Sequence, residues 1–269
     1  MWGAVFYLEF LRGGRRLLHH FARWGYGGWL LLMLLFFSSG IGRFMPCCLP
    51  GGCLLPTQAY TTPAEMLIGQ QFLLLLLAVP ALSAGAITEE KARGTLAELL
   101  MSALTPWRIV AGKFLARSAV VATVSLAGLP LLCWFGGLDW VALLAVLAAE
   151  AGVLGCLASA SILASVWARG LGSALLAAYG LGGLLFAAVR YLGGPFTYFD
   201  PVYLIEPALT DRRAALLGQR VLVSGAAWAG LTLAFLGLAA WRLRPAYLRQ
   251  YLDKGATKPA RRAWWHPRI

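Results

Sequence analysis

The chain has 269 residues, of which 60% are hydrophobic and 13% are charged, and its mean hydropathy is +0.72. A soluble globular domain usually carries about 25% charged residues, so this composition excludes an ordinary soluble domain. It predicts an all-α integral membrane protein with several spans. The net charge of +12 would also suit a nucleic-acid-binding protein, and the positions of the basic residues decide between the two classes.

Residues 1–23 are predicted to form an amphipathic helix in the inner membrane interface. Arg12, Arg16 and Arg23 recur at helical spacing, and the aromatic residues lie largely on another side. The alternative is a disordered basic tail, which the aromatic content disfavours. Because 23 residues precede the first apolar run, we expect that run to be a span and not a cleaved signal peptide.

Six apolar segments follow, each long enough to cross a hydrocarbon core of about 30 Å at about 1.5 Å per residue. A backbone in lipid must satisfy its own hydrogen bonds, so each segment is predicted to be a transmembrane helix. Together they form a transmembrane domain over residues 24–242. The six segments are residues 24–41, 67–86, 115–135, 140–166, 171–192 and 221–241.

The basic residues give the predicted orientation. With the N-terminus inside, 18 Lys and Arg residues fall on the inner side and five on the outer side. This asymmetry predicts a multi-pass protein of the plasma (inner) membrane with both termini in the cytoplasm. Residues 243–269 then form a basic cytoplasmic tail. The lipid bilayer accounts for the positive charge, so no nucleic-acid partner is expected.

Two outer segments carry further features. The loop over residues 193–219 is rich in aromatic residues and proline, which predicts an ordered segment. The stretch MPCCLPGGC places Cys47, Cys48 and Cys53 in one outer loop. An oxidising compartment would permit a disulfide among them. A soft-metal contact, a lipid attachment or no role are the alternatives, and three thiols without a local His do not predict a zinc site.

Glu150 is the one acid deep inside a predicted span, in the stretch LAVLAAEAGVLG. A carboxyl group in the bilayer is costly, so Glu150 is expected to face the interior of the helix bundle. It is a candidate residue of a substrate pathway or of coupling. The alternative is a packing or helix–helix hydrogen-bonding role beside the small residues Ala149, Ala151 and Gly152.

The stretch AITEEKARGTLAELL, residues 86–100, interrupts the apolar chain between the second and third spans. Glu89 and Arg93 stand at i and i+4, which supports a helix. Pro106 ends the element, because the residue before proline avoids helical geometry. We expect a cytoplasmic amphipathic helix over residues 88–105, whose apolar stripe needs a groove in lipid or in a partner protein. The stripe consists of Leu96, Leu99, Leu100 and Ala103.

The segment PALSAGAITEEKARGTLAELLMSALTPWRIVAGK, residues 80–113, resembles the corresponding segment of ABC-2 type transporter permeases. The chain departs from the usual pattern at Ala97-Glu98 and at Arg108. Six spans, an interfacial N-terminal helix and cytoplasmic termini also agree with such permeases. The matching residues are Pro80, Glu89, Glu90, Arg93, Gly94, Thr95, Leu96, Leu99, Leu100, Thr105, Pro106, Ile109, Val110, Gly112 and Lys113.

The resemblance implies that residues 88–105 are a coupling helix, which sits in a cleft of a separate ATPase subunit. Polar contacts would come from Glu89, Glu90 and Arg93, and apolar anchoring from the leucines of the stripe. Gly94 would allow close approach or a sharp start of the helix. The alternative is an amphipathic segment lying on the inner leaflet. The candidate coupling residues are Glu89, Glu90, Arg93, Gly94, Thr95, Leu96, Leu99 and Leu100.

A P-loop pattern is absent, since Gly112-Lys113 is followed by Phe114. The chain is therefore expected to be no enzyme and to hold no cofactor. ATP and Mg²⁺ would bind the partner ATPase, and a second permease copy or a similar chain would complete the pathway. The resemblance implies an exporter of an unknown substrate. Two alternatives stay open: an ion- or proton-coupled secondary transporter, and an ABC-type complex that drives envelope machinery without moving a solute.

Overall fold

A computed structural model describes residues 17–38, 63–101, 104–135, 139–192, 199–200 and 214–256. Helices fill almost all of these ranges, and none of the described residues forms a strand. The predicted all-α fold is therefore confirmed. The helices are α2 Leu17–Ser38, α3 Pro63–Ser83, α4 Gly85–Arg93, α5 Leu96–Met101, α6 Pro106–Ser125, the 3-10 turn η2 Leu126–Gly128, α7 Leu129–Phe135, α8 Trp140–Trp167, α9 Leu171–Leu192 and α11 Ala214–Ala256.

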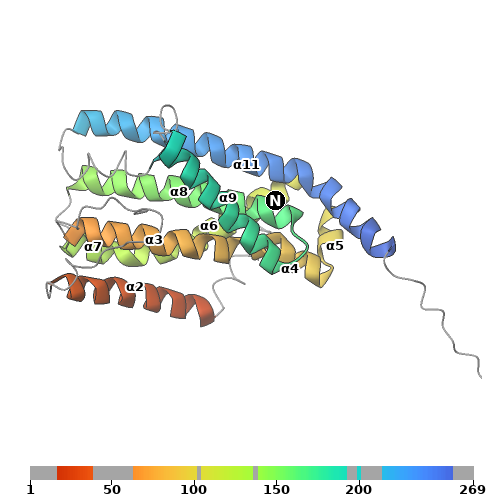
Figure 1. The fold of residues 1–269 in the computed structure, drawn as a ribbon, viewed down its shortest axis with the longest axis horizontal. Coiled ribbons are helices and arrows are strands. Elements are labelled where there is room, and N and C mark those ends of the chain that lie inside the picture. The colour runs from red at the N-terminus through yellow and green to blue at the C-terminus, as the bar shows by residue number, and fades with distance from the viewer. Residues whose placement is uncertain are drawn as a thin grey trace, which may run out of the picture.

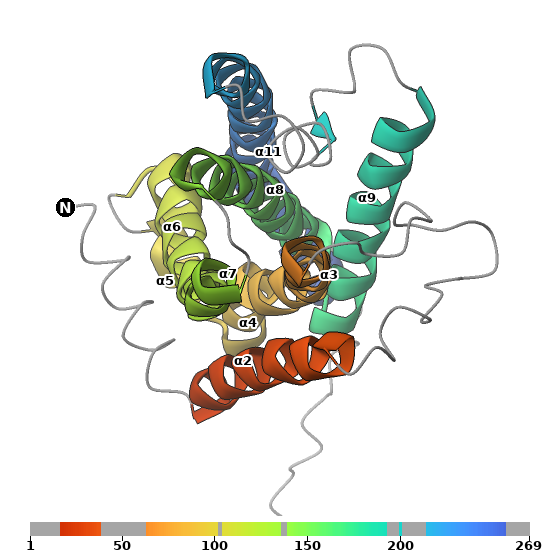
Figure 2. The same ribbon diagram turned by 90° about the vertical axis from the view of Figure 1, so that its left-hand side faces the viewer.

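The helices form one elongated bundle. Figure 1 shows α3, α6, α8 and α11 running along the long axis, with α4 and α5 at one end of the bundle. The view along that axis shows α2 and α9 lying obliquely on the flanks (Figure 2). The short connection between α8 and α9, residues 168–170, also lies at the end that carries α4 and α5.

Five of the six predicted spans correspond to helices that are long and apolar enough to cross a membrane, whereas the first, residues 24–41, corresponds to a shorter apolar helix. Within the described ranges, five helical segments are long and apolar enough to cross a membrane, and a shorter apolar helix covers Trp24–Phe36. This composition and length confirm an integral membrane protein of the all-α class. The five longer segments are Pro63–Arg93, Pro106–Trp134, Trp140–Trp167, Leu171–Val189 and Gly218–Leu248.

Several helices run past the predicted span limits. α2 begins at Leu17, so one continuous helix joins the end of the predicted interfacial segment to the first span. At the other terminus, α11 continues to Ala256 and includes the start of the predicted tail. The remaining predictions for residues 1–16, for Cys47, Cys48 and Cys53, and for most of the loop over residues 193–219 lie outside the described residues.

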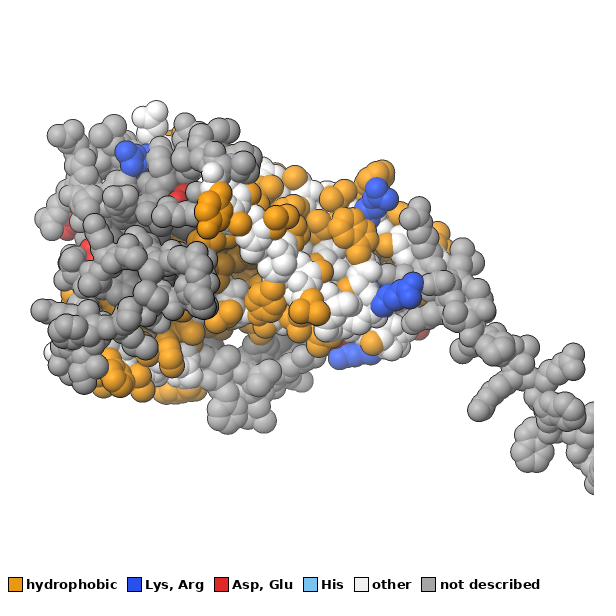
Figure 3. Space-filling model, in the orientation of Figure 1, with side chains coloured by type: hydrophobic (Ala, Val, Ile, Leu, Met, Phe, Trp, Pro, Cys, Tyr) orange, Lys and Arg blue, Asp and Glu red, His pale blue; other side chains and the backbone are white. Residues whose placement is uncertain are grey.

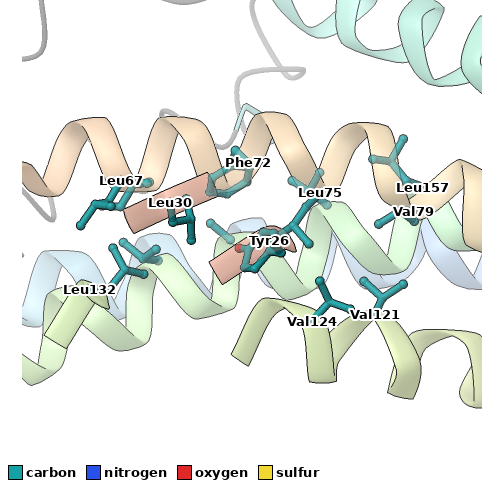
Figure 4. Packing of buried hydrophobic residues seen from close by; sticks show 14 of the residues in the cluster. Tyr26, Leu30, Leu67, Phe72, Leu75, Val79, Val121, Val124, Leu132 and Leu157 are labelled. Atoms are coloured by element: carbon teal, nitrogen blue, oxygen red, sulfur yellow. The ribbon is translucent and has the colours of Figure 1, made fainter. Parts of the chain in front are cut away.

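The apolar interior surrounds α8. One core cluster joins residues of α2, α3, α6, α8 and α11, and a second gathers at the α4–α5 end of the bundle. In Figure 4, Tyr26 and Leu30 of α2 lie between α3 and the helices that carry Leu132 and Val124. The outer surface of the bundle carries many large apolar side chains (Figure 3), as expected for a surface that faces lipid.

A glycine sets the contact between α8 and α11. A Cβ atom added to Gly152 would lie 2.9 Å from Cγ and Cδ1 and 3.1 Å from Cβ of Trp228. Trp228 is itself buried, and its ring meets that of Phe199 edge to face at a centroid distance of 5.5 Å. The indole ring therefore packs directly on the α8 backbone, which requires the absence of a side chain at Gly152.

We predict that Gly152→Ala lowers the stability of the protein by about 1–3 kcal/mol, the usual cost of overpacking a core. Gly155→Ala on the same helix is the matched control, because its added Cβ would meet Thr232 Oγ1 at 3.6 Å, an ordinary contact distance. The apparent melting temperatures of the two variants in detergent test this. A Gly152→Ala protein that melts no lower than Gly155→Ala would contradict the packing described.

Candidate functional site

The candidate site is built where α3 gives way to α4. α3 contains Pro80, which has no backbone N–H, and it ends at Ser83. The chain continues through Ala84, whose amide donates to Pro80 O at 2.9 Å, and α4 begins at Gly85. The new helix start brings new amide groups that need acceptors outside the helix.

Ser165, near the end of α8, accepts two of these amides. Its Oγ lies 3.1 Å from the amide nitrogen of Ile87 and 3.0 Å from that of Thr88, and all three residues are buried. A buried backbone N–H without an acceptor costs about 1–3 kcal/mol. One serine side chain therefore fixes the start of α4 against α8.

Lys91 makes the reverse contact from α4 to α8. Its Nζ donates to the carbonyl oxygens of Ser165 at 3.1 Å, Val166 at 2.5 Å and Ala168 at 3.0 Å. α8 ends at Trp167, so the carbonyl oxygens near this end lack N–H donors within the helix. The ammonium group also lies at the negative end of the helix dipole. Lys91 thus caps α8 and holds α4 across its end.

Glu90 ties the same helix to α6. Its Oε1 lies 2.5 Å from Nζ of Lys113, and the side chains are 14% and 1% exposed. Both charges are largely removed from water, so each depends on the other for compensation. α4 is therefore joined to two membrane-crossing helices, α8 through Ser165 and Lys91, and α6 through Lys113.

Gly94 divides the predicted coupling helix in two. Its φ of +78° and ψ of −2° are left-handed, and its amide donates to Lys91 O at 3.4 Å in a helix-ending geometry. Only glycine adopts this conformation at little cost. The prediction of one helix over residues 88–105 is therefore wrong: α4 ends at Arg93 and the short α5 covers Leu96–Met101. The left-handed Gly94 thus lies between the two helices, and its expected role in close approach or in a sharp start of the helix stays a prediction.

The apolar stripe of α5 packs against the chain itself. Leu96 is fully buried in a cluster that contains Ile109 of α6 and Leu243 of α11, while Leu99 and Leu100 pack partly against it. The expected groove for this stripe is thus supplied by the protein's own bundle. Leu96 has no exposed surface with which to anchor a partner.

The opposite side of the α4–α5 segment is open. We call this the exposed rim, and its side chains face away from the bundle core. Arg93 pairs with Glu89 at 3.7 Å, with side chains 53% and 30% exposed. Such an exposed i,i+4 pair contributes only about 0.3–0.5 kcal/mol and leaves both groups able to find other partners. The exposed rim consists of Arg93, Gly94, Thr95, Glu98 and Met101.

The structure therefore separates the sequence-predicted coupling residues into two groups. Glu90 and Leu96 point inward, whereas Arg93, Gly94 and Thr95 are exposed, and their docking role stays a prediction. Sequence reasoning missed the contribution of Lys91 and Ser165, which are far apart in the chain and carry no recognisable motif. It also missed Met101, which is 80% exposed at the end of α5.

Glu150 faces the bundle interior, as expected. It is 2% exposed, and Ser125 Oγ of α6 donates to its Oε2 at 2.8 Å. This bond fits the helix–helix hydrogen-bonding role, and the pathway role stays a prediction. No three His, Cys, Asp or Glu side chains within the described ranges are grouped so as to hold a metal ion. The disulfide hypothesis concerns residues outside those ranges.

The family model described as "ABC-2 family transporter protein" matches residues 54–203, more than half of the chain. The matched range runs from before α3 to beyond α9 and so includes α4, α5 and the whole candidate site. No curated protein is similar enough to the chain to count as a match.

We predict that Lys113→Met destabilises the protein by about 3–5 kcal/mol, because it leaves the carboxylate of Glu90 largely buried without its partner. The double variant Glu90→Leu/Lys113→Met is expected to recover much of this loss, since both charges are then absent. Glu98→Gln, an exposed change on α5, is the control with little effect. Apparent melting temperatures in detergent measure all three, and a double variant that is no more stable than Lys113→Met would contradict the pairing.

Proposed function

Because the chain belongs to the ABC-2 family of transporter proteins, we propose that it is the membrane-spanning permease subunit of a transporter powered by a separate ATPase. In this proposal ATP and Mg²⁺ bind the ATPase and this chain holds no cofactor. The permease carries out no hydrolysis itself. Its part is to receive the movement of the ATPase and to pass it to the membrane-crossing helices.

The observation that carries this proposal is the attachment of the exposed rim. α4 is hydrogen-bonded to the end of α8 and ion-paired to α6, while Leu96 of α5 is buried among residues of α6, α8 and α11. Packed cores transmit displacement because they deform little. A force applied to the rim would therefore act on three long helices at once.

The rim also has the surface chemistry of a contact with another protein. Met101 is 80% exposed, and the charged residues Arg93 and Glu98 of the same rim are exposed as well. Met and Arg are enriched in protein–protein interfaces. Because Glu90 points inward, it holds the α4–α5 segment in place. In this proposal the residues of the exposed rim contact the ATPase.

The charge distribution supports a cytoplasmic position for this end of the bundle. Basic side chains gather at the α4–α5 end in Figure 3. Exposed Arg93, Arg108, Arg169 and Arg244 belong to α4, to the start of α6, to the α8–α9 connection and to the inner part of α11. By the positive-inside rule we propose that this end faces the cytoplasm of a plasma (inner) membrane and that both termini lie on that side.

We further propose that the complex is an exporter and that a second permease copy, or a similar chain, completes the pathway between two bundles. An ion-coupled secondary transporter is the second candidate function. The observation that favours it is Glu150, a carboxyl group buried within the bundle. A complex that drives envelope machinery would use the same rim and the same ATPase without a transported solute.

The double variant Arg93→Ala/Met101→Gln tests the proposal. We predict that wild-type protein purified from its native membrane in mild detergent carries Mg²⁺-dependent ATPase activity. The activity that is purified with the variant should be at least ten times lower. The physical reason is the removal of an exposed cation and an exposed apolar anchor from one contact surface. ATP hydrolysis by the eluate, divided by the amount of permease, is the measurement.

The matched control is Trp140→Gln. Trp140 is 80% exposed, as is Met101, but lies at the opposite end of the bundle, where α8 begins. It should keep the wild-type activity. A folded wild-type protein that brings no ATPase with it would overturn the permease proposal, and equal loss in Trp140→Gln would show that the rim is not the contact.

A further inference from the structure

Four polar side chains meet in the apolar interior of the bundle. Tyr26 of α2, Gln71 of α3, Ser125 of α6 and Glu150 of α8 are all buried, with 7%, 0%, 6% and 2% of their surfaces exposed. Tyr26 and Gln71 both lie close enough to act on the Glu150 carboxyl group. We call these four residues the polar cluster. Burying one polar group in a membrane protein is costly, and placing four together from four helices points to a shared function.

Most of the polar atoms in the cluster have no hydrogen-bond partner. Ser125 Oγ donates to Glu150 Oε2, but Glu150 Oε1 is left without a partner. The Tyr26 hydroxyl and both amide atoms of Gln71 are also unpartnered. Buried polar side chains nearly always have partners, so this concentration indicates a bound group that supplies them.

The absence of a side chain at Gly128 leaves space for the side chains of Gln71 and Tyr26. A Cβ atom at this position would lie 2.8 Å from Gln71 Oε1 and 3.3 Å from Cε1 of Tyr26. Gly128 belongs to the 3-10 turn η2 between α6 and α7, where the chain departs from the regular α-helix. In Figure 4 the Tyr26 side chain lies at the centre of the core, between α3 and Val124 of α6.

The charge of Glu150 has no protein counter-charge in the part of the chain that the structure describes. Lys113 is the fully buried cation there, and its Nζ lies 2.5 Å from Glu90 near the α4–α5 end. An isolated carboxylate in a low-dielectric interior is strongly unfavourable unless a cation compensates it. The carboxyl group must therefore either hold a proton or be compensated by a cation from outside the chain.

We propose that the polar cluster binds one monovalent alkali cation together with a water molecule. Glu150 Oε1 supplies the negative charge, and Gln71 Oε1, Tyr26 Oη and Ser125 Oγ supply neutral oxygen ligands of the kind that hard cations prefer. The water accepts a hydrogen bond from Gln71 Nε2. This inference is independent of the proposed ATPase partner.

The two simpler occupants each leave part of the site unsatisfied. A water molecule alone would partner the amide and hydroxyl groups but leave the carboxylate charge in the apolar core. A proton on Glu150 would remove the charge, but by itself it would not bridge the Tyr26 hydroxyl and the Gln71 amide, which have no partner within hydrogen-bonding distance. A hydrated cation satisfies both requirements, and it also joins α2 to α3, α6 and α8.

The test measures cation binding by the purified, folded protein at constant pH and ionic strength. We expect sodium or potassium chloride to raise the apparent melting temperature relative to a salt of a large organic cation. We also expect saturable binding of radioactive ²²Na⁺ or ⁸⁶Rb⁺. Glu150→Gln should abolish both effects, and Tyr26→Phe should weaken binding about tenfold by removing one oxygen ligand.

Ser159→Ala is the matched control. Ser159 is a buried serine of α8 whose hydroxyl bonds Cys156 O, within the same helix, so its loss should leave cation binding unchanged. If Glu150→Gln fails to fold, Tyr26→Phe carries the test through isotope binding. A wild-type protein that gains no stability from sodium or potassium and binds no isotope overturns the proposal. In that case, a melting temperature that depends on pH alone would indicate a proton on Glu150, and a melting temperature that depends on neither would indicate a bound water. Unaltered cation binding in Glu150→Gln overturns it as well.

Discussion

The attachment of α4 to the end of α8 is the constraint on which the α4–α5 end of the molecule depends. Backbone groups near or within a bilayer must find partners inside the protein. The start of α4 leaves amides that Ser165 accepts, and the end of α8 leaves carbonyls that Lys91 caps. Each helix thus satisfies the terminus of the other. The position of α5, the burial of its leucines and the exposure of the rim all follow from this mutual capping.

The helices were largely predictable because their signal is local. An apolar run of sufficient length must be helical in lipid, and α9 has the predicted bounds, Leu171–Leu192. The start of α6 was harder to predict from the sequence. The helix begins at Pro106, nine residues before the predicted span, which begins at residue 115. Arg108 and Lys113 lower the hydropathy of the first turns of α6, so hydropathy alone does not identify them as part of the helix. Proline at the first helical position marks the true start better than hydropathy does.

The site was predictable in its location but not in its partners. Helical spacing identified the leucine stripe and showed that it must be covered, yet periodicity does not say by what. The covering groups come from α6, α8 and α11, and their convergence is a property of the tertiary fold. Likewise, residues such as Glu90 and Lys113 are ordinary charges in the sequence. Only their placement on facing helices makes them a buried ion pair.

The same two helices carry both the rim's attachments and the polar cluster. On α6, Lys113 and Ser125 are separated by roughly 18 Å of helix, and on α8, Ser165 and Glu150 by roughly 22 Å, at about 1.5 Å of rise per residue. A helix is stiff over such lengths, so displacement of α4 would change how α6 and α8 sit against each other. The hydrogen bond between Ser125 and Glu150 joins these two helices directly. A change at the α4–α5 end would therefore alter the geometry of the polar cluster before it altered the surrounding apolar contacts, because hydrogen bonds depend on direction and apolar contacts do not.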